Sequence, residues 1–108
     1  MQDTPFVSEY DGFQINGSTE GSIVQQDENT GESWNLGTFE GVNGTVSSYS
    51  GGTYCAAADI SRSLTIIWSC GLEFAITNAT EPSTCIYVFH ATLPCCDFQG
   101  TTSKITVP

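Results

Sequence analysis

The stretch RSLTIIWSCGLEFAITNATEPSTCIY, residues 62–87, decides the fold that we predict for this chain. It holds two strand patterns joined by a turn. In the first pattern apolar residues alternate with polar ones, so that one face of a strand carries Leu64, Ile66, Trp68 and Cys70. In the second, Cys85, Tyr87 and Phe89 share a face. Such alternation, between Gly-, Ser- and Asn-rich turns, predicts an all-β chain.

Three polar side chains of this stretch are candidate functional residues. Arg62 has the parity of the apolar face, which places it at the mouth of a barrel, where its guanidinium needs acceptors. Pro82 keeps Glu81 extended, and Glu81 is the candidate partner of Arg62 in a structural ion pair. The same two groups can converge on a ligand. Tyr87 is either a core residue or part of that site.

Composition limits the classes of function. With 108 residues we expect one domain, 1–108, with a modest core. The net charge is -10, with 2 basic residues against 12 acidic ones, which disfavours nucleic acid and anionic membranes as partners. No apolar run approaches the ~20 residues that cross a bilayer, so we expect no membrane insertion. No signal peptide follows Met1, so the chain is either part of a secreted precursor or a cytoplasmic protein made without a signal.

The 5 cysteines all follow Gly52 and favour disulfides in the second half of the chain. A zinc site is disfavoured because there is no C-x-x-C pair and His90 is the only histidine. His90 lacks the surroundings of a catalytic histidine and is predicted on the surface. Three N-x-S/T sequons, at Asn16, Asn43 and Asn78, fit passage through an oxidising secretory compartment.

The first half of the chain predicts further strands and turns. We expect strands on either side of a turn at Asp11-Gly12, then a strand, a polar turn at 27–31 and a strand around Trp34 and Leu36. A third hairpin turns at 43–44. The 27–31 turn lacks the ligand spacing of an EF-hand, which favours a solvated hairpin.

The motifs R-S-x-x-I, C-G and E-P-S-T-C-x-Y, together with V-Q followed by W-N-L-G, resemble the mannose 6-phosphate receptor homology (MRH) family over roughly residues 24–96. This resemblance implies a flattened β-barrel of two crossed antiparallel sheets, stapled by disulfides in its C-terminal half. It implies bonds between Cys55 and Cys85 and between Cys70 and Cys95 or Cys96. The odd cysteine is then free or links a neighbouring chain, which makes a homodimer an expectation. A family cysteine is missing near Asn16, so packing alone must hold the N-terminal strands.

The resemblance also implies a mannose site made of Gln25, Arg62, Glu81 and Tyr87, with Gln26 as the alternative to Gln25. Arginine supplies only donors, ionised glutamate only acceptors, and glutamine and tyrosine supply both, which suits the hydroxyls of mannose. No metal or other cofactor is expected. The segment before Cys55 has no cationic side chain to pair with phosphate, so an unphosphorylated mannose terminus is favoured.

Three classes of function follow. The first is a lectin that binds terminal mannose of high-mannose N-glycans or glycoproteins, in the secretory pathway or outside the cell. The second is a protein-interaction or sorting-receptor repeat of the same fold without sugar binding. An enzyme is the third and is not expected, because glycoside hydrolysis needs two facing carboxylates and no partner for Glu81 is identifiable.

Overall fold

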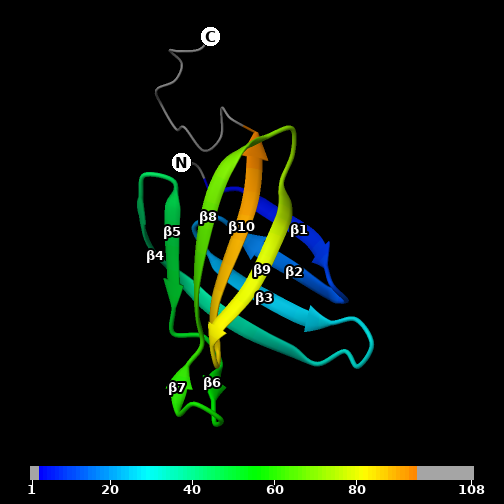
Figure 1. The fold of residues 1–108 in the computed structure, drawn as a ribbon, viewed down its shortest axis with the longest axis vertical. Coiled ribbons are helices and arrows are strands. Elements are labelled where there is room, and N and C mark those ends of the chain that lie inside the picture. Colours follow the sequence, from blue (N-terminus) through cyan, green and yellow to red (C-terminus); the bar gives the residue numbers. More distant parts are fainter. Residues whose placement is uncertain (1–2, 95–108) are drawn as a thin grey trace.

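The computed structural model describes residues 3–94, and this part of the chain consists of strands and turns (Figure 1). None of its segments forms a helix that could cross a membrane. In chain order its strands are β1 (Pro5–Tyr10), β2 (Phe13–Ser18), β3 (Ser22–Asp27), β4 (Ser33–Asn43), β5 (Val46–Ser50), β6 (Tyr54–Cys55), β7 (Ile60–Ser61), β8 (Ser63–Gly71), β9 (Ala75–Ser83) and β10 (Ile86–Pro94). The all-β prediction is confirmed.

The predicted turns lie where the sequence puts them. Asp11 and Gly12 both have positive φ, at 53° and 85°, which suits the tight hairpin between β1 and β2. Asn43 ends β4, and Gly44, with φ of 64°, turns the chain into β5. At the 27–31 turn, the Asp27 carboxylate accepts the backbone N–H groups of Asn29 and Thr30.

The main sheet has the strand order β1-β2-β3-β4-β5-β8-β10-β9 and nearly closes on itself. Figure 1 shows β1, β2 and β3 crossing the direction of β8, β9 and β10, as expected for a flattened barrel. Across the seam between the two edge strands, Ser8 Oγ accepts the Ile76 N–H at 3.4 Å, and the Tyr10 hydroxyl donates to Asn78 Oδ1 at 3.4 Å.

One strand pair departs from the predicted antiparallel arrangement. β8 and β10 pair in parallel, with Phe89 beside Ile66. The cause is that β10 lies between β8 and β9. Because β9 reverses the direction of β8 and β10 reverses it again, the inserted strand must run parallel to β8.

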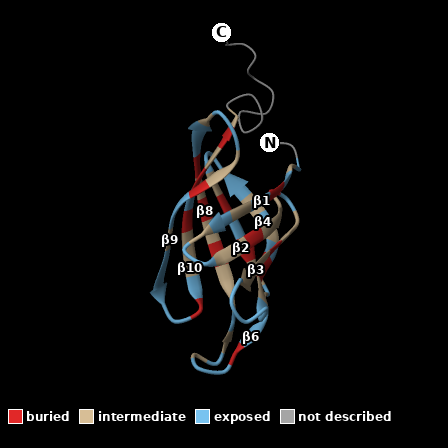
Figure 2. Cartoon of the chain, turned by 90° about the vertical axis from the view of Figure 1, so that its right-hand side faces the viewer, coloured by how far each residue is buried: buried red, intermediate tan, exposed pale blue. Residues whose placement is uncertain are grey.

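The core lies between the crossing strands (Figure 2). Leu64, Ile66 and Trp68 are buried, as their alternation predicts, whereas Cys70 is exposed near the end of β8. Phe6 stacks on Phe74 with ring centroids 4.0 Å apart and meets Trp68 edge-on. This aromatic cluster packs the N-terminal strand onto the core.

Polar groups inside the core are paired. Trp68 Nε1 donates to the buried Ser47 hydroxyl at 2.9 Å, and the Tyr49 hydroxyl donates to the Thr19 carbonyl at 2.6 Å. Burial raises the pKa of the Tyr49 hydroxyl, which therefore stays protonated. Within residues 3–94 no buried side-chain nitrogen or oxygen lacks a hydrogen-bond partner.

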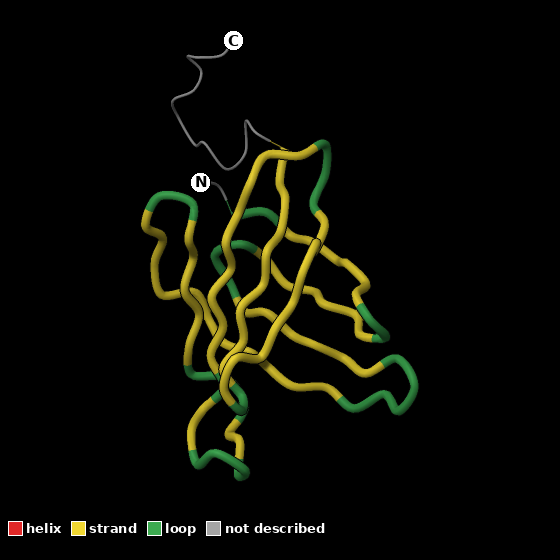
Figure 3. Tube along the Cα trace, in the orientation of Figure 1, coloured by secondary structure: helices red, strands yellow, loops and turns green. Residues whose placement is uncertain are grey.

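The predicted disulfide between Cys55 and Cys85 is confirmed. Cys70 is also disulfide-bonded, while its predicted partners, Cys95 and Cys96, lie outside the described residues. Cys55 belongs to a short hairpin of β6 and β7, which our sequence analysis did not predict and which extends from one end of the barrel (Figures 1 and 3).

Candidate functional site

A cavity of about 220 Å³ opens between the crossing strands. Its lining comes from the β1–β2 hairpin, β3, β9 and β10. The buried side chains of Ile15 and Phe89 contribute an apolar floor. The remaining lining residues are Tyr10, Asp11, Phe13, Gln25, Ala79, Thr80, Glu81 and Tyr87. The cavity thus combines an apolar base with amide, carboxylate and hydroxyl groups.

Gln25 lines the cavity because it has the parity of the fully buried Ile23 on β3. It pairs in register with Ile15 of β2, which is also buried. Gln26 has the opposite parity, and its amide donates to the Gly31 carbonyl at 3.3 Å. Of the two glutamines that the sequence left open, Gln25 is the one at the cavity.

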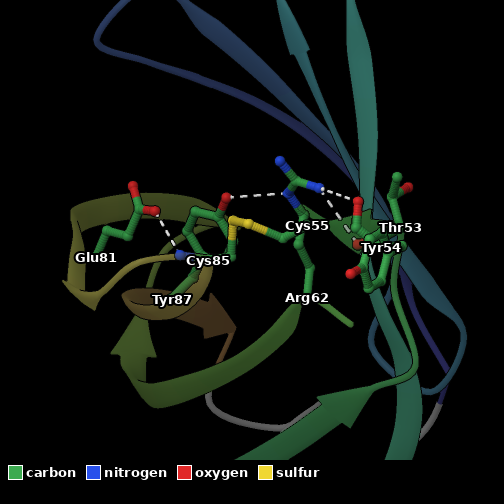
Figure 4. Close-up of a disulfide and its surroundings, with 7 residues drawn as sticks. All are labelled: Thr53, Tyr54, Cys55, Arg62, Glu81, Cys85 and Tyr87. Atoms are coloured by element: carbon green, nitrogen blue, oxygen red, sulfur yellow. Dashed lines mark hydrogen bonds between the residues drawn. A yellow bond between two sulfur atoms is a disulfide. The ribbon is translucent and has the colours of Figure 1, made fainter. Parts of the chain in front are cut away.

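Glu81 lines the cavity from β9, and its carboxylate is tied to the backbone. Glu81 Oε2 accepts the Cys85 N–H at 2.6 Å (Figure 4). Cys85 has a φ of 66°, in the left-handed region that residues other than glycine rarely adopt, so this contact supports a tight turn. The second oxygen, Oε1, has no hydrogen bond within the described chain.

Arg62 does not line the cavity itself but hydrogen-bonds to Tyr87, which does. Its Nε donates to the Tyr87 hydroxyl at 3.3 Å, and its Nη1 donates to the carbonyls of Thr53 and Tyr54 at 3.2 and 3.1 Å (Figure 4). Tyr87 lines the cavity directly, whereas Arg62 stands behind it. The four predicted site residues are therefore brought together, three on the cavity wall and one adjacent.

The ion pair between Arg62 and Glu81 that the sequence suggested does not form. Among residues 3–94 neither group has the other as a hydrogen-bond or ion-pair partner. Both side chains form hydrogen bonds to the backbone instead. The guanidinium donates to the carbonyls of Thr53 and Tyr54, and the carboxylate accepts the Cys85 N–H. The acceptors that Arg62 needed are supplied by the main chain.

The Cys55–Cys85 disulfide joins the two halves of this arrangement (Figure 4). Cys55 directly follows the two residues whose carbonyls hold Arg62, and Cys85 supplies the N–H that holds Glu81. Both cysteines are buried, at 3% and 4% exposure. The covalent bond therefore fixes the segments that orient the arginine and the glutamate relative to each other.

The β1–β2 hairpin contributes three cavity residues that were not predicted from the sequence, namely Tyr10, Asp11 and Phe13. The turn at Asp11-Gly12 was predicted, but its place beside β9 depends on the closure of the sheet. The aromatic residues on either side of this turn, Tyr10 and Phe13, were the available signal. Asp11 adds a second carboxylate to the cavity wall.

The solved structures that resemble this chain over most of its length include three of MRH domains. The MRH domain of glucosidase II beta bound to mannose has 24% identity and a TM-score of 0.71, covering 84% of this chain and 89% of its own. A point mutant of the GBII-beta MRH domain has 25% identity and a TM-score of 0.67, covering 88% and 92%. The MRH domain of Yos9, complexed with alpha3,alpha6-Man5, has 16% identity and a TM-score of 0.60, covering 91% and 78%.

The chain has the fold of an MRH domain. The resemblance inferred from the sequence motifs is confirmed at the level of three-dimensional structure. No protein-family model matches the sequence, and no curated protein matches it either. The assignment to the MRH fold therefore comes from the solved structures.

Acidic residues lie beside the hairpin turn that contributes Asp11 to the cavity wall. The Glu28 N–H donates to the Gly12 carbonyl at 3.0 Å, which joins the 27–31 turn to the hairpin that carries Asp11. A hydrogen bond between the side chains of Glu28 and Glu9 raises the pKa of Glu28, and slight desolvation and the charges of Glu9 and Asp27 act in the same direction. In the described part of the chain, no three or more His, Cys, Asp or Glu side chains are arranged to hold a metal ion.

We expect Glu28→Gln to raise the melting temperature at neutral pH. The pKa of Glu28 is raised in the folded state because its protonated carboxyl hydrogen-bonds to Glu9. This hydrogen bond therefore stabilises the fold fully below the usual pKa of 4.5, and its stabilisation is lost as the pH rises through the raised pKa. The glutamine amide can donate to Glu9 at any pH. Thermal unfolding between about pH 4 and pH 8 should show a gain at neutral pH that shrinks in acid.

Glu32→Gln, directly after the same turn, is the matched control, since it removes one negative charge without touching the Glu9 contact. An equal gain in both variants would attribute the effect to net charge rather than to the Glu9–Glu28 pair.

Proposed function

We propose that this chain is a lectin domain that binds the terminal mannose of high-mannose N-glycans and does not depend on phosphate. The observation that carries the proposal is that Gln25, Glu81 and Tyr87 line one cavity while Arg62 hydrogen-bonds to the Tyr87 hydroxyl. The likeness to MRH domains in complex with mannose and with a Man5 glycan supports it.

The free hydrogen-bonding groups of the site match a sugar. Oε1 of Glu81 is an unused acceptor and Nη2 of Arg62 an unused donor within the described chain, while Gln25 can act as both. Mannose offers an axial 2-hydroxyl beside equatorial 3- and 4-hydroxyls, each both donor and acceptor. A sugar with an equatorial 2-hydroxyl would leave a buried group unpaired, at a cost of about 1 to 3 kcal/mol.

The size of the cavity favours a single sugar ring. Its volume of about 220 Å³ is below the roughly 300 to 1,000 Å³ typical of sites for drug-sized ligands. The apolar floor of Ile15 and Phe89 suits the C–H face of a pyranose. Only the terminal residue of a glycan would then be enclosed.

Charge argues against phosphate recognition. Asp11 and Glu81 line the cavity, and Glu28 lies beside the hairpin turn that carries Asp11. Arg62 is already engaged with two backbone carbonyls and a hydroxyl. A phosphate on the sugar would meet more like charge than pairing charge.

We assign binding without turnover to this site. Glycoside hydrolysis uses paired carboxylates roughly 5 to 9.5 Å apart, with one of them acting as an acid. Glu81 Oε2 already accepts the Cys85 N–H, an arrangement that suits an acceptor of hydroxyl hydrogen bonds. Because Asp11 shares the cavity with Glu81, an assay for free mannose tests this assignment.

The proposal extends to the setting of the domain. The disulfides at Cys55, Cys85 and Cys70 favour an oxidising compartment. We therefore place the protein in the secretory pathway or outside the cell, where a single domain over residues 1–108 would bind glycoproteins. Homodimer formation through Cys95 or Cys96 stays a prediction, because both residues lie outside the described part of the chain.

Isothermal titration with mannose and α-linked dimannose tests the function. We expect binding that survives EDTA, glucose weaker by about 5- to 150-fold, the equivalent of 1 to 3 kcal/mol, and no gain with mannose 6-phosphate. No free mannose should appear from an oligomannose substrate. Absence of mannoside binding by the folded protein would favour a protein-interaction module, and released mannose would favour an enzyme.

A further inference from the structure

Trp34 of β4 lies against the chain's one arginine. Arg62 Cζ is 5.6 Å from the centroid of the Trp34 ring, a distance at which a guanidinium is attracted to an aromatic face. The ring is half-buried and packs against the core. Trp34 is not among the residues that line the cavity, so any effect on a ligand passes through a neighbour.

The backbone explains how the two residues meet. Thr53 donates its N–H to the Asn35 carbonyl at 2.8 Å, and its hydroxyl accepts the Asn35 N–H at 2.9 Å. Thr53 also accepts the Arg62 N–H at 3.1 Å. At Gly52 any Cβ would collide with the Asn35 carbonyl, so glycine permits this close approach. Residues 52–53 hydrogen-bond both to Arg62 and to Asn35 of β4, and they thereby hold Arg62 beside the strand that contains Trp34.

The contacts of the guanidinium leave one edge for a ligand. Nε is directed at Tyr87 and Nη1 at two carbonyls, while Nη2 has no hydrogen-bond partner within residues 3–94 (Figure 4). The Trp34 ring contacts the same group by its face. Trp34 also pairs in register with Gln25, so it stands between two of the proposed site residues.

We propose that Trp34 is a positioning residue of the sugar site. Its ring holds the guanidinium of Arg62 so that Nη2 is presented to a hydroxyl of the bound mannose. This inference rests on the proposed function. An unsupported arginine side chain samples several rotamers, and each hydrogen bond it makes to a ligand then costs ordering entropy. A ring that already holds the group reduces that cost.

Trp34→Leu and Trp34→Phe separate positioning from packing. Both remove volume from the half-buried site, but only phenylalanine keeps an aromatic face. In isothermal titration with mannose we expect Trp34→Leu to weaken binding by roughly 2- to 30-fold and Trp34→Phe by less. Thermal unfolding should show a similar loss of stability in both variants.

The free protein offers a readout that does not involve sugar. A single arginine gives a single Nε–Hε signal in a ¹H–¹⁵N spectrum. We expect the Trp34 ring current to shift that signal, the leucine variant to lose the shift, and the phenylalanine variant to keep part of it. Faster hydrogen exchange of Nε–H should accompany the loss.

The proposal is supported if mannose affinity decreases from wild type to Trp34→Phe to Trp34→Leu and the shift of the arginine Nε–Hε signal decreases in the same order. Wild-type affinity in the leucine variant, or equal losses in both variants, overturns it. If the leucine variant does not fold, the phenylalanine variant decides by the same two measurements. If the folded wild-type protein binds no mannoside, the proposed function itself is wrong. If the wild type binds mannose and the leucine variant binds it equally well, only the role of Trp34 is wrong.

Discussion

Arg62→Lys is expected to weaken mannose binding by about 1.5 to 3 kcal/mol, or roughly 10- to 150-fold, the range for hydrogen bonds that involve a charged group. Lysine keeps the positive charge but loses the planar fork. The guanidinium donates to Tyr87 and to two backbone carbonyls, and within residues 3–94 its Nη2 has no hydrogen-bond partner. An ammonium with three donors cannot keep those contacts in one plane and also serve a ligand.

Isothermal titration of mannose or α-linked dimannose, beside thermal unfolding, tests this expectation. Ser61→Ala is the matched control, because Ser61 is exposed and adjacent to Arg62 in the chain. If Arg62 is purely structural, the lysine variant will melt earlier while its folded fraction binds mannose normally. Unchanged affinity would therefore remove Arg62 from the site, whatever happens to stability.

Removing the disulfide with Cys55→Ala and Cys85→Ala together is expected to lower the free energy of unfolding by about 2 to 5 kcal/mol. The bond spans 30 residues, for which the chain-entropy model gives on the order of 3 kcal/mol. Mannose affinity should fall as well, since the bond fixes the carbonyls that hold Arg62 relative to the N–H that holds Glu81.

Urea unfolding gives the stability change, and titration at a temperature where the variant is folded gives the affinity. The double substitution isolates this bond, whereas chemical reduction would also open the disulfide of Cys70. Ala56→Ser on the same hairpin is the control for a local sequence change. A variant with normal affinity would show that the bond stabilises the fold without shaping the site.

The local features of the fold were predictable because they depend on neighbouring residues. Alternation at Leu64, Ile66 and Trp68 predicted an inward face, and all three are buried. The Asp11-Gly12 turn was predictable because few residues tolerate positive φ. The hairpin of β6 and β7 was missed, since strands of two residues carry too little periodicity to recognise.

The candidate site was predictable only in part. The motif resemblance singled out Gln25, Arg62, Glu81 and Tyr87, and the fold brings them together. Their partners could not be predicted. The acceptors of Arg62 are main-chain carbonyls, which every residue carries, so no side-chain pattern marks them.

The sequence by itself determined the all-β class, the positions of most turns and, through its motifs, the Cys55–Cys85 bond. Only the tertiary structure decided that β10 inserts beside β8, that Asp11 reaches the cavity, and that Trp34 meets Arg62. The physical reason is range. Periodicity and turn preference act over a few residues, whereas these contacts join segments that meet only when the sheet closes.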